Sequence, residues 1–206
     1  MADPKSDPTR DDVLVEVKNL SKSFVAETNF FGRPTSYVRA VEDVSFKIRR
    51  GEAFGLVGES GCGKTTIGKM LVGLLKPSGG RIYFEGEDIT DASKQRRREL
   101  CRDIQLIFQD PYASLNPRMT VEQIVSEPIV TNGILPAEAI DARVDELLER
   151  VGIRPDLKRR YPHEFSGGQR QRVGIARALA VNPKLIVCDE PVSALDVSIQ
   201  AQVLNL

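Results

Sequence analysis

Residues 58–65, with the sequence GESGCGKT, have the most specific spacing for chemistry in this chain. They fit the pattern G-x-x-x-x-G-K-[ST], in which a glycine-rich loop turns several backbone N–H groups toward one phosphate group. The apolar run 53–57 before the loop predicts a buried strand, and residues 65–75 after it predict a helix. Such a helix would point its positive end at the same anion. The alternative, a glycine-rich turn without a ligand, does not account for both flanking elements.

Individual residues of this loop have separate expected roles. Lys64 supplies a point charge for the outer phosphates, and the hydroxyl of Thr65 is a ligand for Mg²⁺. Cys62 is expected to contribute its backbone N–H, with a passive thiol. The predicted phosphate-binding residues are Gly58, Ser60, Gly61, Cys62, Gly63, Lys64, Thr65 and Thr66.

A second candidate anion site lies at residues 165–172, with the sequence FSGGQRQR. Ser166 offers a hydroxyl, while Gly167 and Gly168 leave their backbone N–H groups accessible. The helix predicted over residues 169–181 would begin directly behind them. Taken alone, the segment fits an ordinary capped helix equally well, but beside a phosphate loop the anion site is favoured.

Carboxylates and a carboxamide follow two further apolar runs. Residues 185–188 (LIVC) predict a strand, and Asp189 and Glu190 come directly after it. Residues 104–108 predict another strand, and Gln109 follows that one. Ligands bind at the C-terminal edge of a parallel sheet, so these three side chains are candidates for the reacting site.

The motifs and their order resemble those of the ABC ATPase family, over nearly the whole chain. Residues 165–169 resemble its LSGGQ signature, with Phe165 in the place of leucine, and residues 185–190 resemble its Walker B strand. Residues 193–196 (SALD) resemble its D-loop, and Gln109 resembles its Q-loop glutamine.

This resemblance implies ATP and Mg²⁺ as ligands. Glu190 would polarise the attacking water, assisted by Gln109, and Mg²⁺ would be held by Thr65, Gln109 and Asp189. In the family, the signature of one subunit closes over ATP held by the other, so two chains make two composite sites. The residues implied to reach ATP in the partner are Ser166, Gly167, Gly168 and Gln169, with Asp196 in the D-loop.

The family also places an aromatic side chain against the adenine. Phe24 stands at that place in the sequence, and stacking of this kind contributes about 1–3 kcal/mol per base. Tyr37 is a rival for the role, and Phe24 could instead be a core residue.

Three stretches narrow the resemblance to the ATP-binding subunits of oligopeptide and dipeptide importers: residues 109–118 (QDPYASLNPR), residues 57–64 and the polar insert 26–36. The implied protein is cytoplasmic and peripheral on the inner face of the membrane. Its implied partners are a second ATPase subunit, identical or different, and transmembrane permease subunits contacted through the Q-loop region. A peptide-binding protein would be an indirect partner. The chemistry of these residues does not itself identify a peptide.

The composition restricts the class of protein further. The chain has 206 residues, of which 41% are hydrophobic, and its 29 basic and 29 acidic residues give no net charge. A globular domain without a global basic field is expected, and no nucleic-acid partner. No apolar run reaches the roughly 20 residues of a membrane span. The three cysteines, Cys62, Cys101 and Cys188, lack metal-binding spacing and are expected to be reduced thiols.

The predicted fold class is α/β, an ABC ATPase fold with a P-loop NTPase core, an N-terminal antiparallel β region and a helical subdomain that carries the signature. Residues 1–12 are expected to be a disordered lead-in. The core lobe is expected to comprise residues 13–110 and 182–206, and the helical lobe residues 111–181. Alternation over residues 13–17 and 44–48 predicts strands. Apolar residues at helical spacing over 140–151 predict a helix, with Pro136 near its start and Gly152 at its end.

One element of the family pattern is absent from the sequence. The family carries a switch histidine on the strand after the D-loop, whereas this sequence ends at Leu206, and its only histidine, His163, precedes the signature. His163 is expected to be a surface or capping residue. The chain is therefore expected to be truncated at its C-terminus, mostly monomeric, and a weak ATPase or none, because groups that act as a unit fail together.

Two other functions remain open at this stage. The first is a soluble ABC ATPase that acts on nucleic acid or the ribosome, against which the zero net charge counts. The second is a non-catalytic nucleotide-binding module.

Overall fold

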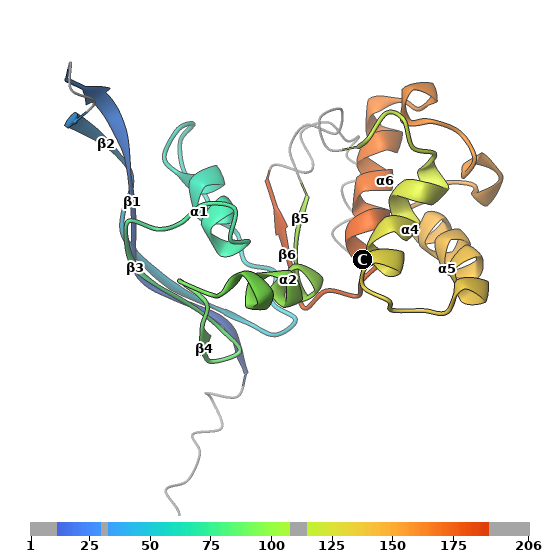
Figure 1. The fold of residues 1–206 in the computed structure, drawn as a ribbon, viewed down its shortest axis with the longest axis horizontal. Coiled ribbons are helices and arrows are strands. Elements are labelled where there is room, and N and C mark those ends of the chain that lie inside the picture. Colours follow the sequence, from blue (N-terminus) through green and yellow to red (C-terminus); the bar gives the residue numbers. More distant parts are fainter. Residues whose placement is uncertain (1–11, 30–32, 108–114, 190–206) are drawn as a thin grey trace, which may run out of the picture. The chain divides into compact units, whose positions relative to one another are not determined.

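A computed structural model describes residues 12–29, 33–107 and 115–189 of the chain (Figure 1). The chain forms two compact units, residues 1–98 and residues 99–206. The division into a core lobe (13–110 and 182–206) and a helical lobe (111–181) expected from the sequence remains a prediction. Within the described residues, no helix combines the length and apolar character that a membrane crossing requires.

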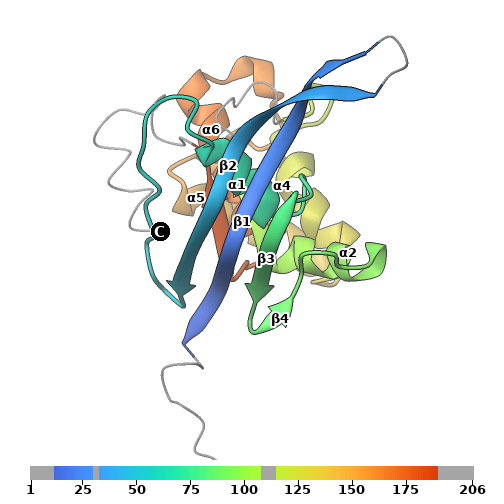
Figure 2. The same cartoon turned by 90° about the vertical axis from the view of Figure 1, so that its left-hand side faces the viewer.

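The first unit is built on a four-stranded antiparallel sheet with the order β2-β1-β3-β4 (Figure 2). Its long strands are β1 (Val13–Thr28) and β2 (Pro34–Arg49), and they are followed by β3 (Gly79–Phe84) and β4 (Glu87–Asp88). These strands confirm the two strands that the alternating residues predicted and the N-terminal antiparallel β region that the family resemblance implied. Residues of one face are buried and form the core of this sheet: Val15, Val17, Leu20, Ile82 and Phe84.

Helix α1 (Lys64–Leu71) lies on one face of this sheet and packs against β2 (Figures 1 and 2). Ile67, Met70 and Leu71 form its buried stripe. The helix is shorter than the predicted 65–75, because Gly73 has a φ of +73° and closes the last turn. The N–H of Leu74 donates to Lys69 O and that of Gly73 to Met70 O, the hydrogen bonds of a Schellman cap.

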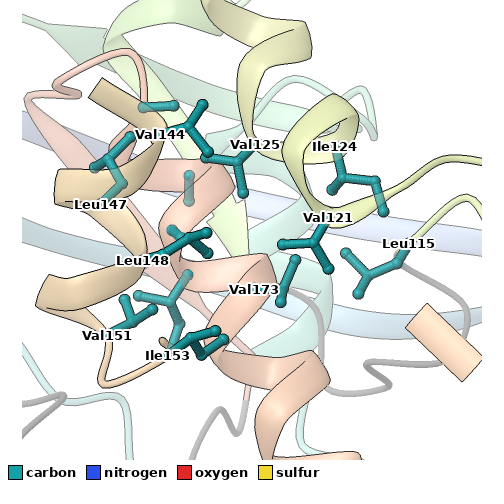
Figure 3. Close-up of a cluster of buried hydrophobic side chains, with 14 of the residues drawn as sticks. Leu115, Val121, Ile124, Val125, Val144, Leu147, Leu148, Val151, Ile153 and Val173 are labelled. Carbon is teal, nitrogen blue, oxygen red and sulfur yellow. The ribbon is translucent and has the colours of Figure 1, made fainter. Parts of the chain in front are cut away.

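The second unit contains a parallel strand pair and a helical core. Strand β5 (Ile104–Ile107) pairs with β6 (Leu185–Cys188), as the two apolar runs predicted. The helices are α4 (Val121–Thr131), α5 (Ala137–Arg150) and α6 (Gly167–Leu179), with the short 3-10 turns η1 (Pro155–Leu157) and η2 (Pro162–Glu164). Figure 3 shows the apolar cluster that these helices share, which includes Val121, Ile124, Val125, Val144, Leu147, Leu148, Val151, Ile153 and Val173.

Helix α5 begins after Pro136 and is followed by Gly152, as the sequence predicted. Its C-terminal end receives a cation from α6. The Nη1 atom of Arg172 lies 3.3 Å from Val151 O and 3.1 Å from Gly152 O. A guanidinium at this position satisfies carbonyls that have no partner inside the helix and also complements the helix dipole. The contact therefore ties α5 to the helix that follows the signature.

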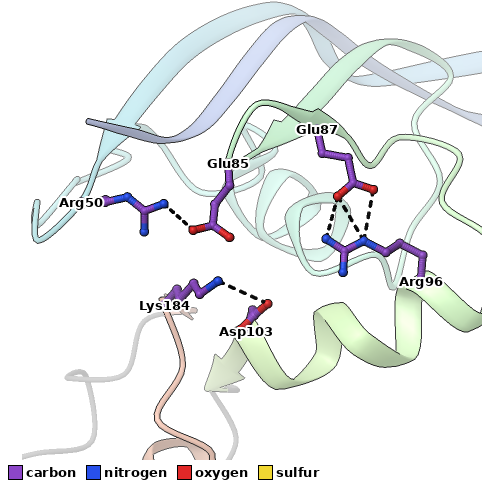
Figure 4. A network of polar contacts seen from close by, with 6 residues as sticks. All are labelled: Arg50, Glu85, Glu87, Arg96, Asp103 and Lys184. Atoms are coloured by element: carbon purple, nitrogen blue, oxygen red, sulfur yellow. Dashed lines mark hydrogen bonds and ion pairs between the residues drawn. The ribbon is translucent and has the colours of Figure 1, made fainter. Parts of the chain in front are cut away.

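Surface ion pairs fix connections within each unit (Figure 4). Helix α2 (Lys94–Asp103) begins in the first unit, where Arg96 pairs with Glu87 at 2.6 Å and lowers the pKa of that carboxyl group. Arg50 pairs with Glu85 of the β3–β4 turn. In the second unit, Lys184 lies 3.8 Å from Asp103. Exposed pairs of this kind contribute little to stability, so they serve mainly to orient the chain.

Candidate functional site

The segment before the phosphate loop differs from its prediction. Residues 53–57 form no strand, and the side chain of Val57 is 98% exposed. The prediction of a buried strand was wrong for this structure, because an apolar run becomes a strand only where a neighbouring strand pairs with it. No described strand pairs with this segment. One aromatic contact holds it near the sheet, where Phe54 stacks on Phe46 of β2 with ring centroids 5.1 Å apart.

The phosphate loop is anchored to the sheet by a very close backbone contact at Gly63. This residue has a φ of +95° and stands immediately before α1. A Cβ atom built on it would lie 2.3 Å from Ala40 O and 3.0 Å from Val41 Cγ2 of β2. Only glycine fits both the left-handed backbone and this approach. The contact fixes where α1 begins relative to β2.

Lys64 lies against the loop that precedes it. Its Nζ atom donates to Gly58 O and Glu59 O, at 2.8 Å each, and lies 3.8 Å from Cys62 Sγ. An ammonium group has three donors, so two hold loop carbonyls and the third faces a weak sulfur acceptor. An anionic oxygen would be a far stronger acceptor than the sulfur.

The first turn of α1 supplies the backbone donors of the site. The first hydrogen bond into the helix runs from Ile67 N–H to Gly63 O, at 2.9 Å. The amides of Lys64, Thr65 and Thr66 precede it in the first turn, where the N–H groups of a helix point toward its N-terminal end. They combine with the helix dipole to make this end suitable for an anion.

Phe24 and Tyr37 occupy opposite faces of the sheet. Lys22 of β1 pairs with Val41, whose side chain lies beside Gly63, so Lys22 is on the face that carries α1. Phe24 is two residues further along β1 and shares that face, because side chains alternate along a strand. Tyr37 pairs with Val25, the next residue of β1, and therefore points to the other face.

Residues 166–169 form a capping box at the start of α6, which begins at Gly167, two residues earlier than predicted. The N–H of Gln169 donates to Ser166 Oγ at 3.3 Å, and the N–H of Ser166 donates to Gln169 Oε1 at 3.0 Å. Each acceptor atom of the box receives one of these hydrogen bonds. What remains to face outward is the Ser166 hydroxyl proton, the Gln169 amide protons and the first N–H groups of α6. This is a set of donors suited to an anion.

The turn before the signature is held by Arg170, a residue that the sequence patterns did not single out. Arg170 Nε donates to Pro162 O at 2.7 Å, and Nη2 lies 3.3 Å from His163 O. His163 is exposed and stacks on Tyr161, with ring centroids 5.7 Å apart, which agrees with its expected surface role. Arg170 thus fixes the entry into the signature helix.

Asp189 follows β6 directly, and the parallel pair holds it in place. Its N–H donates to Ile107 O, at 3.0 Å, so Asp189 lies beside the C-terminal end of β5. Gln109 is two residues beyond that end in the sequence, but Gln109, Glu190 and Asp196 all lie outside the described residues. The pairing confirms that the two predicted strands are parallel neighbours. The described residues contain no cluster of metal-binding His, Cys, Asp and Glu side chains, and Cys62, Cys101 and Cys188 are free thiols.

The described elements can be compared with known proteins. The model of the ABC transporter family matches residues 41–193, which include the phosphate loop, the signature and β6. The chain belongs to the ABC transporter family.

Solved structures and named proteins that are similar to this chain support the family assignment. A dimeric structure of the ATP-binding cassette MJ0796 in a post-hydrolysis state, bound to ADP and Pi, superposes with a TM-score of 0.82 at 30% sequence identity, over 93% of this chain and 80% of that one. The fold is therefore that of ABC ATPase cassettes.

Two named relatives illustrate the similarity in sequence. The oligopeptide transport ATP-binding protein AppF of Bacillus subtilis is 51% identical over 95% of this chain and 60% of its own length. The glutathione import ATP-binding protein GsiA of Escherichia coli is 53% identical over 94% of this chain and 31% of its own length. The chain thus spans about 60% or less of the length of these relatives.

The contact at Gly63 gives a prediction for this ABC transporter chain. Gly63→Ala should destabilise the first unit more than Gly61→Ala. Both residues have positive φ, +95° and +83°, so both substitutions carry strain of about 1–2 kcal/mol, but only the methyl group at position 63 meets a backbone carbonyl. Urea unfolding followed by circular dichroism would measure the difference. Equal midpoints for the two variants would show that the loop is not anchored at Ala40.

Proposed function

We propose that the chain is the ATP-binding and ATP-hydrolysing subunit of an importer for peptides. The observation that carries the proposal is the phosphate loop, in which the Lys64 ammonium donates to the loop carbonyls of Gly58 and Glu59 at the start of α1. Such a loop holds the β- and γ-phosphates of a nucleotide. The remaining assignments concern the base, the metal ion, the partner's nucleotide and the cargo.

Lys64 is suited to bind the phosphates without rearranging. Two of its three protons hold Gly58 O and Glu59 O, so the side chain is already ordered over the loop. The third proton would exchange Cys62 Sγ for a phosphate oxygen and form a charge-assisted hydrogen bond. Because the side chain is ordered beforehand, little conformational entropy is lost when the anion binds.

Phe24 is proposed to stack on the adenine, in preference to Tyr37. A base and the phosphates of one nucleotide must be bound on the same side of the sheet. Phe24 shares the α1 face and is 42% exposed, which leaves ring surface for a base. Tyr37 is more exposed, at 61%, but belongs to the opposite face.

Mg²⁺ is the metal ion that the candidate donors fit. Thr65 supplies a hydroxyl, Asp189 a carboxylate and Gln109 a carboxamide, and Mg²⁺ prefers such oxygen donors. It supplies charge neutralisation for the phosphates when bound. Glu190, directly after Asp189 in the sequence, is proposed to polarise the attacking water.

The signature is proposed to bind ATP held by a second subunit, identical or different. Ser166, Gly167, Gly168 and Gln169 offer donors, and the side-chain oxygens of Ser166 and Gln169 already accept hydrogen bonds inside the capping box. A solved relative, MJ0796, is dimeric and holds ADP and Pi, which supports this arrangement. Two chains would then make two composite sites, and binding of ATP would close them.

The cargo and membrane partners are inferred from relatives. The relative that is 51% identical to this chain is named for oligopeptide transport, and the one that is 53% identical is named for glutathione import. Both cargoes are peptides, and the names favour an importer over an enzyme of nucleic acid. Permease subunits, contacted through residues 109–118, and a peptide-binding protein are the proposed partners, and the chain would be peripheral on the cytoplasmic face of the membrane.

Removal of the loop cation tests the phosphate site. Lys64→Ala should weaken Mg-ATP binding, since a hydrogen bond to a charged group contributes about 1.5–3 kcal/mol. Lys69→Ala is the matched control, because it removes the same charge from an exposed position of the same helix. Calorimetry would compare the two variants. Equal affinities would argue against a phosphate site at Lys64.

The face argument for the base is tested by a pair of aromatic substitutions. Phe24→Ala should lower the affinity for Mg-ATP by about 1–3 kcal/mol of stacking free energy, while Tyr37→Ala should leave it unchanged. Binding of Mg-tripolyphosphate, which has no base, should be equal in both variants. A larger loss of ATP affinity in Tyr37→Ala would reverse the assignment.

Coupling to transport is tested in the assembled importer with its permease subunits. Glu190→Gln should leave ATP binding intact and reduce hydrolysis about 100-fold or more, as expected for loss of a general base. Glu149→Gln, which changes an exposed acid of α5, is the control. Peptide-stimulated phosphate release is the measurement. Wild-type turnover in Glu190→Gln would exclude this residue as the base. If no peptide stimulated phosphate release by the wild-type importer, the proposed cargo would be excluded.

A further inference from the structure

Lys22 has no role in the phosphate loop or the signature, yet its side chain lies between the proposed base-binding ring and the connection that follows α1. Its Nζ atom lies 5.3 Å from the centroid of the Phe24 ring and donates to Lys76 O, at 2.6 Å. An ammonium group over an aromatic face is attracted by the electrons of the ring. Lys22 therefore contacts the proposed base-binding ring and the connection that follows α1.

The carbonyl that receives Lys22 is itself held in place. The N–H of Ser78 donates to Ser21 O at 2.9 Å, and the N–H of Ser23 donates to Ser78 Oγ at 3.1 Å. These bonds join residues 76–78 to β1 on both sides of Lys22. The ammonium is thus directed to a fixed acceptor, so its place over the ring does not depend on a mobile partner.

We propose that Lys22 is a positioning residue for the base: it holds the Phe24 ring from one side, so that the adenine stacks on the other. The inference rests on the proposed role of Phe24. The ring is 42% exposed at the surface of a strand, where packing alone leaves it rotational freedom. An ammonium group anchored at Lys76 O removes part of that freedom before the nucleotide binds, and such preorganisation favours affinity.

The pairing of β1 with β2 relates this proposed base site to the proposed phosphate site. Lys22 pairs across the sheet with Val41, and the Val41 side chain lies beside Gly63. Lys22, which is proposed to position the ring, and Val41, which lies beside Gly63 of the phosphate loop, are therefore neighbours on one face of the sheet. This geometry fits one nucleotide whose base contacts Phe24 and whose phosphates contact the loop.

Substitution of Lys22 tests the inference by binding measurements. Lys22→Met keeps the aliphatic stem and removes the charge, and it should weaken Mg-ATP binding about two- to five-fold, the range of an exposed cation–π contact. Binding of Mg-tripolyphosphate should not change, and Lys22→Arg should restore ATP affinity. Lys18→Met is the matched control, because Lys18 lies on the same strand with its Nζ 4.8 Å from the ring centroid of Tyr83.

A double-mutant cycle separates action through the ring from other effects. In a Phe24→Ala background, Lys22→Met should no longer change the affinity for ATP. A loss that persists in that background, or an equal loss for tripolyphosphate, would overturn the inference, since Lys22 would then act on the phosphates or on the fold. If Phe24→Ala weakens ATP binding and Lys22→Met does not, this inference fails and the base site stands. If Phe24→Ala has no effect, the base site fails as well.

Fluorescence gives a readout of ring position that does not depend on affinity. The sequence contains no tryptophan, so Phe24→Trp introduces a single indole reporter. Its fluorescence anisotropy in the absence of nucleotide should be higher with Lys22 than with Lys22→Met, because the ammonium restricts the ring. Equal anisotropy in two folded variants would show that Lys22 does not position the residue.

Discussion

The contact between Gly63 and the backbone of Ala40 determines how the first unit can present a ligand site. It joins the start of α1 to β2 at a separation that admits no Cβ atom. The N-terminal amides of the helix, the Lys64 ammonium and one face of the sheet are thereby held in fixed positions relative to one another. Since Val41 takes part in the contact and pairs with Lys22, the position of Phe24 along β1 follows from the same constraint. The proposed phosphate and base sites would both depend on this one backbone approach.

The two proposed anion sites attract charge by local means. The chain has no net charge, so no global field would draw a nucleotide to it. At α1 and at α6 the attraction comes instead from helix N-termini, whose first N–H groups have no intrahelical partner. Glycines keep these groups accessible, and at α6 the two side-chain acceptors of the capping box already receive hydrogen bonds from backbone N–H groups. The α1 site adds a full cation within the loop, Lys64, which suits it to the outer phosphates.

The local patterns of the sequence predicted most elements, and the misses share a physical cause. Strands β5 and β6, helix α5 and the N-terminal sheet were predicted because alternation, helical spacing and flanking residues act over a few positions. Residues 53–57 were predicted wrongly because a strand also needs a partner strand, which a local run cannot specify. The choice between Phe24 and Tyr37 stayed open for the same reason: their faces depend on the register of β1 against β2, which shifts at several places, one of them between Lys22 and Ser23.

Lys64 has a structural role in the loop as well as its proposed role in phosphate binding. Two of its donors join the carbonyls of Gly58 and Glu59, so the side chain closes the loop that it serves. Loss of the ammonium would therefore loosen the loop and remove a phosphate contact at the same time. Arginine would not replace it well, because a planar guanidinium directs its donors in a rigid fork, whereas an ammonium is a compact charge with three rotatable donors. The requirement for lysine thus follows from the loop carbonyls as much as from the phosphates.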